Sequence, residues 1–149
     1  MKPTTEDATQ LALNVHRGQL DKNGAPYILH PLRVMAQMQT ETDRIVAVLH
    51  DVVEDSRGKA NEVTLDGLRR MGYPKRVVDA IGGVTRREGE SYEHFVLRSK
   101  HNPISRRVKL ADLLDNMDVR RLRRRLSARD LSRLAKYRRA WEELRDDTE

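Results

Sequence analysis

The sequence predicts an all-α protein of several packed helices, and three observations lead to this prediction. Apolar residues recur at spacings of three and four along the chain, as in helices that bury one face. The β-branched residues form short groups without the period-two alternation of half-buried strands. Proline and glycine stand between the apolar segments, where helices begin and end. Because the 149 residues contain no low-complexity linker, a single domain is expected over residues 1–149.

Each expected helix begins at a capping residue or at a proline. Thr4 or Thr5 can cap the first helix, and Thr42 or Asp43 can cap the third. Pro31 opens the second, because proline is favoured at the first helical position. The expected helices cover residues 4–15, 31–38, 42–53, 64–71, 74–83, 91–100, 103–116 and 127–144.

The last two helices and one loop carry further signals. Asp112 and Asn116 are four residues apart and therefore share one helix face. Ser127 and Asp130 resemble a capping box in which Asp replaces the usual Glu or Gln. Residues 84–89 are the one place where the sequence leaves room for a small β-hairpin.

Four ionisable residues stand close together in the apolar run of residues 49–55. They are His50, Asp51, Glu54 and Asp55. Uncompensated burial of charge is very costly, so a histidine and three acids near a core-facing helix call for a cation. Adjacent side chains on a helix point about 100° apart, so His50 and Asp51 can share an ion only if it lies over the edge between them.

Two further residues complete a candidate metal site. His30 precedes a proline and Asp112 lies in a Leu-Ala-Asp-Leu-Leu run, so together with His50 and Asp51 they make two imidazoles and two carboxylates. This mixture suits Mn²⁺, with Zn²⁺, Fe²⁺ or Co²⁺ as other candidates. A thiolate zinc site is excluded, because the chain has no cysteine. Taken singly, His30 could simply start a helix and Asp112 could be a buried, hydrogen-bonded acid, so the prediction depends on the four together.

Three ordered motifs resemble those of the hydrolase domain of RelA/SpoT-type alarmone enzymes, which are HD-domain phosphohydrolases. The first is His-Arg-Gly-Gln at residues 16–19 with Gly-Ala-Pro-Tyr-Ile-Leu-His-Pro at 24–31. The second is Leu-His-Asp-Val-Val-Glu-Asp at 49–55, and the third is Lys-Leu-Ala-Asp followed by Asn-Met within 109–117. The resemblance covers residues 8–122, and the short chain is most similar to the stand-alone small alarmone hydrolases of the metazoan SpoT homolog type.

This resemblance implies an HD-domain fold and hydrolysis of the 3′-pyrophosphate of guanosine tetra- or pentaphosphate. The products would be pyrophosphate and GDP or GTP. The implied roles are Mn²⁺ ligation by His30, His50, Asp51 and Asp112, positioning or activation of water by Glu54 and Asp55, and nucleotide contacts by Lys22, Tyr27 and Asn116.

The residues themselves are consistent with this chemistry. Glu54 lies one turn after His50, where it can accept a proton from an attacking water or orient that water. A pyrophosphate leaving group needs nearby cations, and Lys22 is the first candidate. Arg86 and Arg87 are weaker candidates, because they are more readily explained as residues of an exposed loop.

Two departures from the family pattern concern the nucleotide. Asp21 stands where the family has an arginine that stacks on the guanine, and a carboxylate can neither stack in that way nor attract a phosphate. Leu113, Leu114 and Asp115 replace a segment that usually carries Arg and His. The metal set is complete, so recognition of the base is the step that these changes affect.

The chain is basic, with a formal net charge of +6, and much of the excess lies between Arg120 and Arg125. An arginine cluster can bind nucleic acid through phosphates, but it is more commonly the solvated face of a helix, here with Leu122 and Leu126 turned inward. One Phe and one Trp offer little surface for stacking on single strands. A small nucleotide is therefore the expected partner, nucleic acid is not, and the cluster can help to attract a polyanion.

No apolar run is long enough to cross a membrane, and no signal-peptide segment follows Met1. The absence of cysteine is compatible with a reducing compartment. We therefore expect a cytoplasmic protein without membrane contact, and the sequence makes no prediction of its oligomeric state.

Three classes of function remain open on the sequence. The leading one is a Mn²⁺-dependent alarmone pyrophosphohydrolase. The second is the same catalytic core acting on another phosphorylated nucleotide, such as a phosphorylated dinucleotide cofactor, which Asp21 favours. The third is a non-catalytic nucleotide- or RNA-binding module, which the arginine cluster favours and the intact set of metal and acidic residues disfavours.

Overall fold

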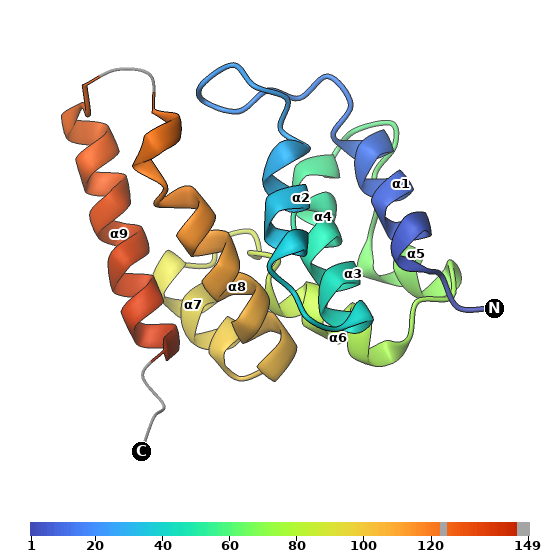
Figure 1. The fold of residues 1–149 in the computed structure, drawn as a ribbon. Helices are drawn as coiled ribbons and strands as arrows, with labels where there is room; N and C mark the ends of the chain where they lie inside the picture. The colour runs from blue at the N-terminus through green and yellow to red at the C-terminus, as the bar shows by residue number, and fades with distance from the viewer. Residues whose placement is uncertain (123–124, 146–149) are drawn as a thin grey trace.

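The computed structural model describes residues 1–122 and 125–145, and within these ranges the regular structure is helical, as predicted (Figure 1). An isolated bridge between Leu20 and Pro26 is the only β pairing in the described ranges. The elements are α1 (Thr5–Val15), α2 (Leu29–Ala36), α3 (Glu41–Leu49), α4 (Val52–Ser56), α5 (Leu65–Arg70), α6 (Lys75–Gly83), α7 (Tyr92–Lys100), α8 (Pro103–Asn116), the 3₁₀ helix η1 (Val119–Arg121) and α9 (Ala128–Arg145). The small hairpin considered for residues 84–89 is not formed, because side chains of neighbouring helices hold this loop instead of a strand pair.

Capping side chains explain most of the helix starts. Thr4 and Asp7 form a reciprocal capping box at α1, and Ser127 and Asp130 do the same at α9. The cap of α3 is Thr40 and not Thr42 or Asp43, because the Thr40 hydroxyl reaches the Asp43 amide at 3.1 Å.

The second helix begins earlier than predicted. It starts at Leu29, so Pro31 lies within its first turn and not at its first position. A proline is tolerated there, because the amide groups of the first turn have no partner inside the helix. Two turn hydrogen bonds, from Leu29 N to Pro26 O and from His30 N to Tyr27 O, lead the chain into α2.

The third predicted helix is broken at its functional residues. It was expected to run through residue 53, but α3 ends at Leu49, His50 and Asp51 form a turn, and α4 starts at Val52. His50 causes the break: its Nδ1 donates to the Ala47 carbonyl oxygen at 2.6 Å, and its backbone amide also turns to that oxygen at 3.4 Å. In a continuous helix the Asp51 amide would use this carbonyl, so the side chain of His50 competes with the helix for it.

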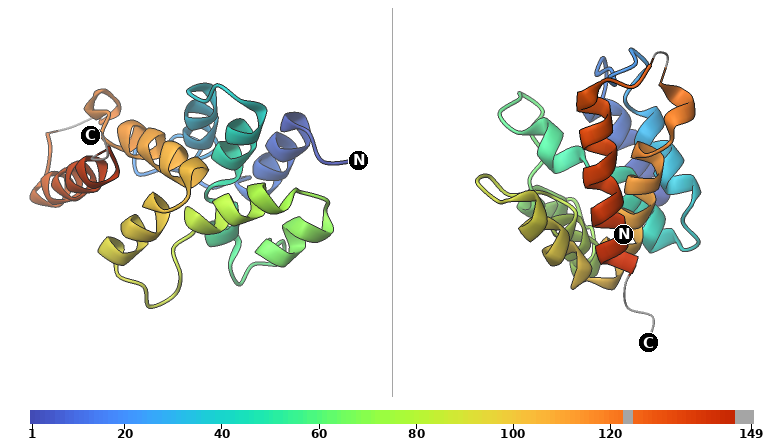
Figure 2. Two further views of the ribbon diagram at one scale, coloured as in Figure 1. Left: turned by 90° about the horizontal axis from the view of Figure 1, so that it is seen from below. Right: turned by 90° about the vertical axis from the view of Figure 1, so that its left-hand side faces the viewer.

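Two hydrophobic clusters hold the helices together (Figures 1 and 2). The larger cluster joins α1 to α6 and one side of α8, and α3 lies at its centre, in contact with α1, α2, α6 and α8. The smaller cluster joins α7, α8 and α9. The left view in Figure 2 shows α9 at one end of the molecule, and in the right view it lies in front of the other helices. Because α8 contributes to both clusters, it holds its polar residues between them.

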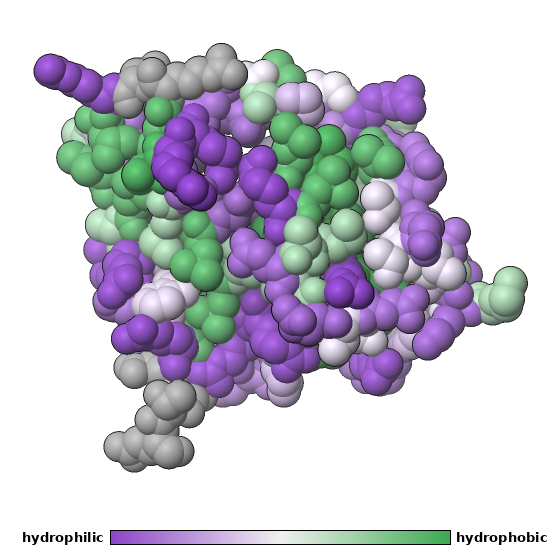
Figure 3. Space-filling view, viewed as in Figure 1, coloured by the Kyte–Doolittle hydropathy of each residue, from purple (hydrophilic) through white to green (hydrophobic). Residues whose placement is uncertain are grey.

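The described arginines of the cluster do not lie along one face of an α-helix, as the sequence had suggested. Arg120 and Arg121 belong to η1, residue 122 and residues 125–127 have no regular structure, and Arg123 and Arg124 lie outside the described residues. The predicted inward position of Leu126 is wrong, because 37% of its surface is exposed. The space-filling view shows hydrophobic residues over the start of α9 and over the upper end of α2, with hydrophilic residues between them (Figure 3). Among the described residues, no helix has the length and apolarity needed to span a membrane.

Candidate active site

His30, His50 and Asp112 come together although as many as 82 residues separate them in the sequence. They belong to α2, to the end of α3 and to α8, and all three are buried. One ligand atom from each lies within 4.8 Å of the others. The Asp112 Oδ1 atom is 2.9 Å from His30 Nε2 and 3.5 Å from His50 Nε2. The described residues therefore contain a triad of donor groups that could hold a metal ion.

Asp51, the fourth predicted ligand, borders this triad from the turn between α3 and α4. Its Oδ2 atom is 3.0 Å from His50 Nε2 and 3.8 Å from His30 Nε2, and it accepts a hydrogen bond from the Tyr27 hydroxyl. The turn thus brings two consecutive residues, His50 and Asp51, to the same centre. The structure therefore brings three of the four predicted ligands together and places the fourth, Asp51, at their edge.

The charges and donors of this group fit a divalent cation. His50 uses Nδ1 to donate to a backbone carbonyl, so the lone pair of the neutral ring lies on Nε2, which is buried without a hydrogen-bond partner among the described residues. Burial lowers the pKa of His50, but the carboxylates of Asp51 and Asp112 outweigh burial and raise the pKa well above its ordinary value. The surroundings therefore favour positive charge at the position of this nitrogen, which a bound cation would supply.

Asp115 orients His30 from the side away from the triad. The His30 Nδ1 group donates to Asp115 Oδ2 at 2.6 Å, and Arg33 donates to both carboxylate oxygens at 2.8 and 3.1 Å. Burial raises the pKa of Asp115, but the bonds from His30 and Arg33 hold it below the ordinary value. A carboxylate that fixes a histidine in this way is typical of metal sites. No motif in the sequence predicted that Asp115 orients His30. The spacing of three residues between Asp112 and Asp115 indicated only that these two side chains share one helix face.

Asp112 has two more partners on α8. Lys109 donates its Nζ to Asp112 Oδ2 at 2.8 Å, and Asn116 donates its Nδ2 to Oδ1 at 3.0 Å. Burial would raise the pKa of Asp112, but Lys109 and the two histidines hold it well below the ordinary value. The carboxylate is therefore kept ionised, as ligation of a cation requires. Asn116, predicted as a nucleotide contact, also holds a predicted metal ligand.

Glu54 and Asp55 lie half-buried at the start of α4, beside this group. Glu54 accepts a hydrogen bond from the Arg86 backbone amide at 2.7 Å, and Asp55 accepts one from Gln19 Nε2 at 3.0 Å. Burial raises the pKa of both carboxyls, and the charge of Asp51 adds to this effect. A raised pKa makes a carboxylate a better proton acceptor near neutral pH.

Residues of the first motif hold Asp55 in place. The buried His16 pairs through Nδ1 with Gln19 Oε1 at 2.9 Å, and the amide nitrogen of Gln19 reaches Asp55. The ring of His16 also lies against Tyr27, with ring centroids 5.0 Å apart. The first and second motifs are thus connected side chain to side chain.

A cavity of about 360 Å³ opens beside His30. Its walls are the loop at residues 19–23, the C-terminal end of α8, η1 and the first half of α9. The predicted nucleotide contacts Lys22, Tyr27 and Asn116 all line it. This volume lies within the range of small-molecule sites. The walls also include residues of α9 that no motif predicted, such as Arg133 and Tyr137, because only the packing of α9 on α8 brings them here.

The cations around this cavity repel one another. Burial together with Arg133 and Lys136 lowers the pKa of Lys22. Burial together with Arg86, Arg133 and Lys109 lowers the pKa of Lys136. Positive groups crowded in this way are stabilised by a bound polyanion. Arg86 is partly buried and acts on Lys136, while Arg87 is exposed.

Asp21 lines the cavity but uses its carboxylate on its own loop. Its Oδ1 atom accepts hydrogen bonds from the backbone amides of Asn23 at 2.8 Å and Ala25 at 3.0 Å. Asp21 therefore stabilises the turn that presents Lys22, a role that the sequence comparison did not predict. These two amides stabilise part of the negative charge of Asp21, so Asp21 should repel a phosphate less strongly than the sequence suggested.

Replacing Asp115 with alanine tests whether the support of His30 matters. The affinity for Mn²⁺ should fall by about 10- to 100-fold, the usual cost of losing a group that orients a metal-binding histidine. Calorimetric titration measures the affinity, and circular dichroism verifies the fold. Asp79→Asn, which alters a half-exposed ion pair with Lys75, is the control. An unchanged affinity in Asp115→Ala would show that His30 needs no such support.

Comparisons with known proteins give a consistent result. Models of protein families give no match. A guanosine-3′,5′-bis(diphosphate) 3′-pyrophosphohydrolase of Aquifex aeolicus is 32% identical over 122 residues, which are 74% of this chain and 17% of that protein. A GTP pyrophosphokinase of Streptomyces coelicolor is 35% identical over 133 residues, 80% of this chain and 15% of that protein. The bifunctional (p)ppGpp synthase/hydrolase SpoT of Escherichia coli is 27% identical over 122 residues, covering 72% of this chain and 16% of that protein.

The chain spans only 15–17% of the length of these three relatives. A solved structure of a metazoan ortholog of SpoT, a protein that hydrolyzes ppGpp, matches with a TM-score of 0.72 and 19% identity. That match covers 99% of this chain and 89% of the other, which confirms the predicted all-α fold of the HD-domain type. By sequence, the chain is therefore similar to SpoT-type pyrophosphohydrolases and to GTP pyrophosphokinases, and by fold it is similar to the metazoan SpoT ortholog.

Proposed function

We propose that the protein is a metal-dependent hydrolase that removes the 3′-pyrophosphate of guanosine tetra- and pentaphosphate, with Mn²⁺ as the metal. The buried group of His30, His50 and Asp112, with Asp51 at its edge, is the observation that carries this proposal. These four residues would hold the ion, since two imidazoles and two carboxylates suit Mn²⁺ among divalent metals. A divalent ion held there would polarise a phosphoryl oxygen of the substrate.

The remaining side chains have separate tasks in this proposal. Water attacks the phosphorus next to the 3′ oxygen and the bond between them breaks. The released diphosphate carries the oxygen of the water, and the 3′ oxygen takes up a proton from solvent and becomes the ribose hydroxyl. Glu54 accepts the proton of the attacking water, and Asp55 orients that water. Lys22, Arg133 and Tyr137 line the cavity in which the nucleotide would bind. Mutual repulsion among the cations in this region is relieved when a phosphorylated nucleotide enters.

The candidate metal ligands and the neighbouring acid Glu54 favour hydrolysis over pyrophosphate transfer. The relatives carry both names, pyrophosphohydrolase and pyrophosphokinase, and they match over similar lengths, so the names do not discriminate. A synthase must bind a second nucleotide as pyrophosphate donor. A hydrolase needs only an electrophilic ion beside an acid that accepts the proton of the water. In this proposal, Asp112 and its two histidines would hold the ion, and Glu54 would accept the proton.

A second candidate function is supported by one observation at the cavity. Asp21 occupies the place of a base-stacking arginine and points its carboxylate at its own loop. A site that does not stack on guanine in this way could accept another phosphorylated nucleotide, such as a phosphorylated dinucleotide cofactor.

One experiment separates these functions. The purified chain is incubated with Mn²⁺ and guanosine tetraphosphate, its adenosine counterpart, or a 2′-phosphorylated dinucleotide, and the products are separated by chromatography. We expect pyrophosphate and GDP from the guanosine compound, loss of activity with EDTA, and recovery on addition of excess Mn²⁺. Release of phosphate from the dinucleotide alone would establish the second function. A lack of turnover with every nucleotide would contradict both.

The cavity cations should act on binding. Arg133→Met should raise KM for guanosine tetraphosphate about 10- to 100-fold, corresponding to the roughly 1.5–3 kcal/mol of a hydrogen bond to a charged group. The value of kcat should change little, because Arg133 lines the cavity and does not belong to the metal group. Arg129→Met, at an exposed position on the same helix, is the control in steady-state kinetics. An unchanged KM would place the substrate elsewhere.

A further inference from the structure

Arg98 of α7 makes several hydrogen bonds to the loop between α6 and α7. Arg98 donates from Nη1 to the Gly82 carbonyl oxygen at 2.7 Å and from Nη2 to the Thr85 carbonyl oxygen at 2.6 Å. It also pairs with Glu90 through Nε at 2.9 Å and Nη2 at 3.0 Å. Glu90 lies two residues before α7, and its side chain is only 6% exposed. Arg98 therefore joins both ends of the loop to the end of α6.

One peptide group of this loop connects Arg98 to the candidate active site. The carbonyl oxygen of the peptide between Thr85 and Arg86 accepts the bond from Arg98. The amide of the same peptide, on Arg86, donates to Glu54 Oε1 at 2.7 Å. Because a peptide group is planar and rigid, fixing its oxygen also fixes the direction of its N–H. The guanidinium, the peptide and the carboxylate thus form a continuous chain of hydrogen bonds.

The next peptide is fixed as well. Arg57, at the end of α4, donates from Nη2 to the Arg86 carbonyl oxygen at 2.7 Å. The loop is therefore attached to α4 and its C-terminal end by the bonds of Glu54 and Arg57, and to α7 by Arg98. Of these attachments, only those of Arg98 hold the oxygen of the peptide that contacts Glu54.

We propose that Arg98 is a positioning residue for Glu54 and acts through the peptide between Thr85 and Arg86. This inference rests on the proposed function, in which Glu54 accepts the proton of the attacking water. Arg98 does not line the cavity and contacts none of the predicted metal ligands. Its guanidinium presents a rigid set of donors in three directions, which the single ammonium group of lysine cannot reproduce.

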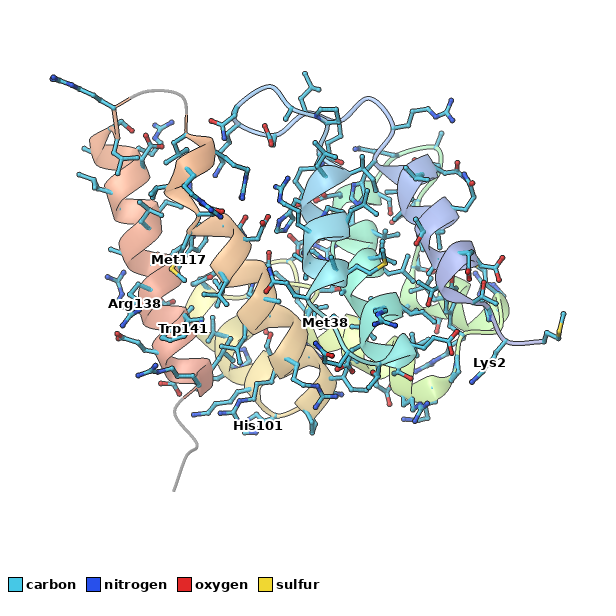
Figure 4. The ribbon with its side chains drawn as sticks, in the orientation of Figure 1. Lys2, Met38, His101, Met117, Arg138 and Trp141 are labelled. Carbon is cyan, nitrogen blue, oxygen red and sulfur yellow. The ribbon has the colours of Figure 1, made fainter. Side chains whose placement is uncertain are left out.

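Arg98→Lys is the substitution that tests this role, because it keeps the charge beside Glu90. We expect kcat for guanosine tetraphosphate to fall about 10- to 100-fold, since a displacement of about 1 Å in a catalytic group has a cost of this size. KM and the Mn²⁺ affinity should change less than about twofold. Arg138→Lys, in an exposed ion pair with Glu142 on the outer side of α9 (Figure 4), is the matched control.

A double-mutant cycle with Glu54→Gln separates positioning from a purely structural role. If Arg98 acts through Glu54, Arg98→Lys should have no further effect on kcat once Glu54 is replaced, because the two changes remove the same contribution. An equal loss of kcat in both backgrounds would overturn the proposal, and so would an unchanged kcat in the single variant.

A readout without substrate tests the chain of bonds itself. Exchange of the Arg86 amide proton, followed by NMR in the Mn²⁺-free protein, should be at least about 10-fold faster in Arg98→Lys, because the peptide is no longer held against Glu54. Unchanged exchange would overturn the inference even if the enzyme is active. A wild-type protein that does not release pyrophosphate, but whose Arg86 amide responds as expected, would contradict only the proposed function.

Discussion

His50→Ala should abolish Mn²⁺ binding and, with it, the release of pyrophosphate. The ring of His50 is 2% exposed and presents an unpartnered nitrogen to Asp51 and Asp112. Replacing a group that merely orients a ligand costs about 10- to 100-fold in metal affinity, so removal of the nitrogen itself should exceed 100-fold. Calorimetry with Mn²⁺ measures the binding, and a pyrophosphate assay measures the reaction.

His101→Ala is the matched control for this experiment. His101 is exposed in the turn between α7 and α8, at the lower edge of the view in Figure 4, and should tolerate alanine in both measurements. The thermal transition of His50→Ala must remain cooperative, so that loss of binding can be assigned to the site and not to unfolding. Full Mn²⁺ affinity in a folded His50→Ala protein would show that His50 is not a ligand of the metal.

The combined substitution Glu54→Gln and Asp55→Asn should lower kcat by about 10²–10⁴-fold, which is the usual contribution of a general base. Both changes preserve shape and remove a carboxylate whose pKa is raised by burial. Because neither residue belongs to the group of converging ligand atoms, Mn²⁺ should still bind. The comparison of turnover with metal affinity therefore separates chemistry from ligation.

Exposed acids of the same types provide the control. Glu62→Gln with Asp66→Asn removes two solvent-exposed carboxylates, one before α5 and one in its first turn, and should leave kcat unchanged. If Glu54→Gln with Asp55→Asn retains full turnover, another group must accept the proton. Loss of Mn²⁺ binding in this double variant would instead show that Glu54 or Asp55 is a metal ligand.

Local signals in the sequence predicted the helices well where a side chain caps its own helix. Thr4 and Ser127 are examples, because the donor and the acceptor lie within three residues of each other. The break after Leu49 was missed, because it depends on the rotamer of His50 and not on its helix propensity. The loop at residues 84–89 was misjudged for a related reason: its partner, Arg98, lies on the following helix.

In the candidate site, too, some residues could be predicted from the sequence and others depend on partners that are distant in the chain. His30, His50, Asp51 and Asp112 could be selected from the sequence, since residue types and a family resemblance pointed to them, and the structure brings them together. The groups that hold these residues were not predicted. Asp115 pairs with a histidine 85 residues away, which no periodicity reveals. Residues of α9 reach the cavity only through the packing of the smaller hydrophobic cluster.

The break between α3 and α4 also sets a condition for transplanting this site into another scaffold. A designer who copies the pair His50 and Asp51 onto a straight helix would obtain side chains that diverge by about 100°. The break that avoids this divergence is produced by His50 itself, through its bond to the Ala47 carbonyl. A successful graft must therefore carry the whole segment from Ala47 to Val52, including a backbone that permits one lost helical hydrogen bond.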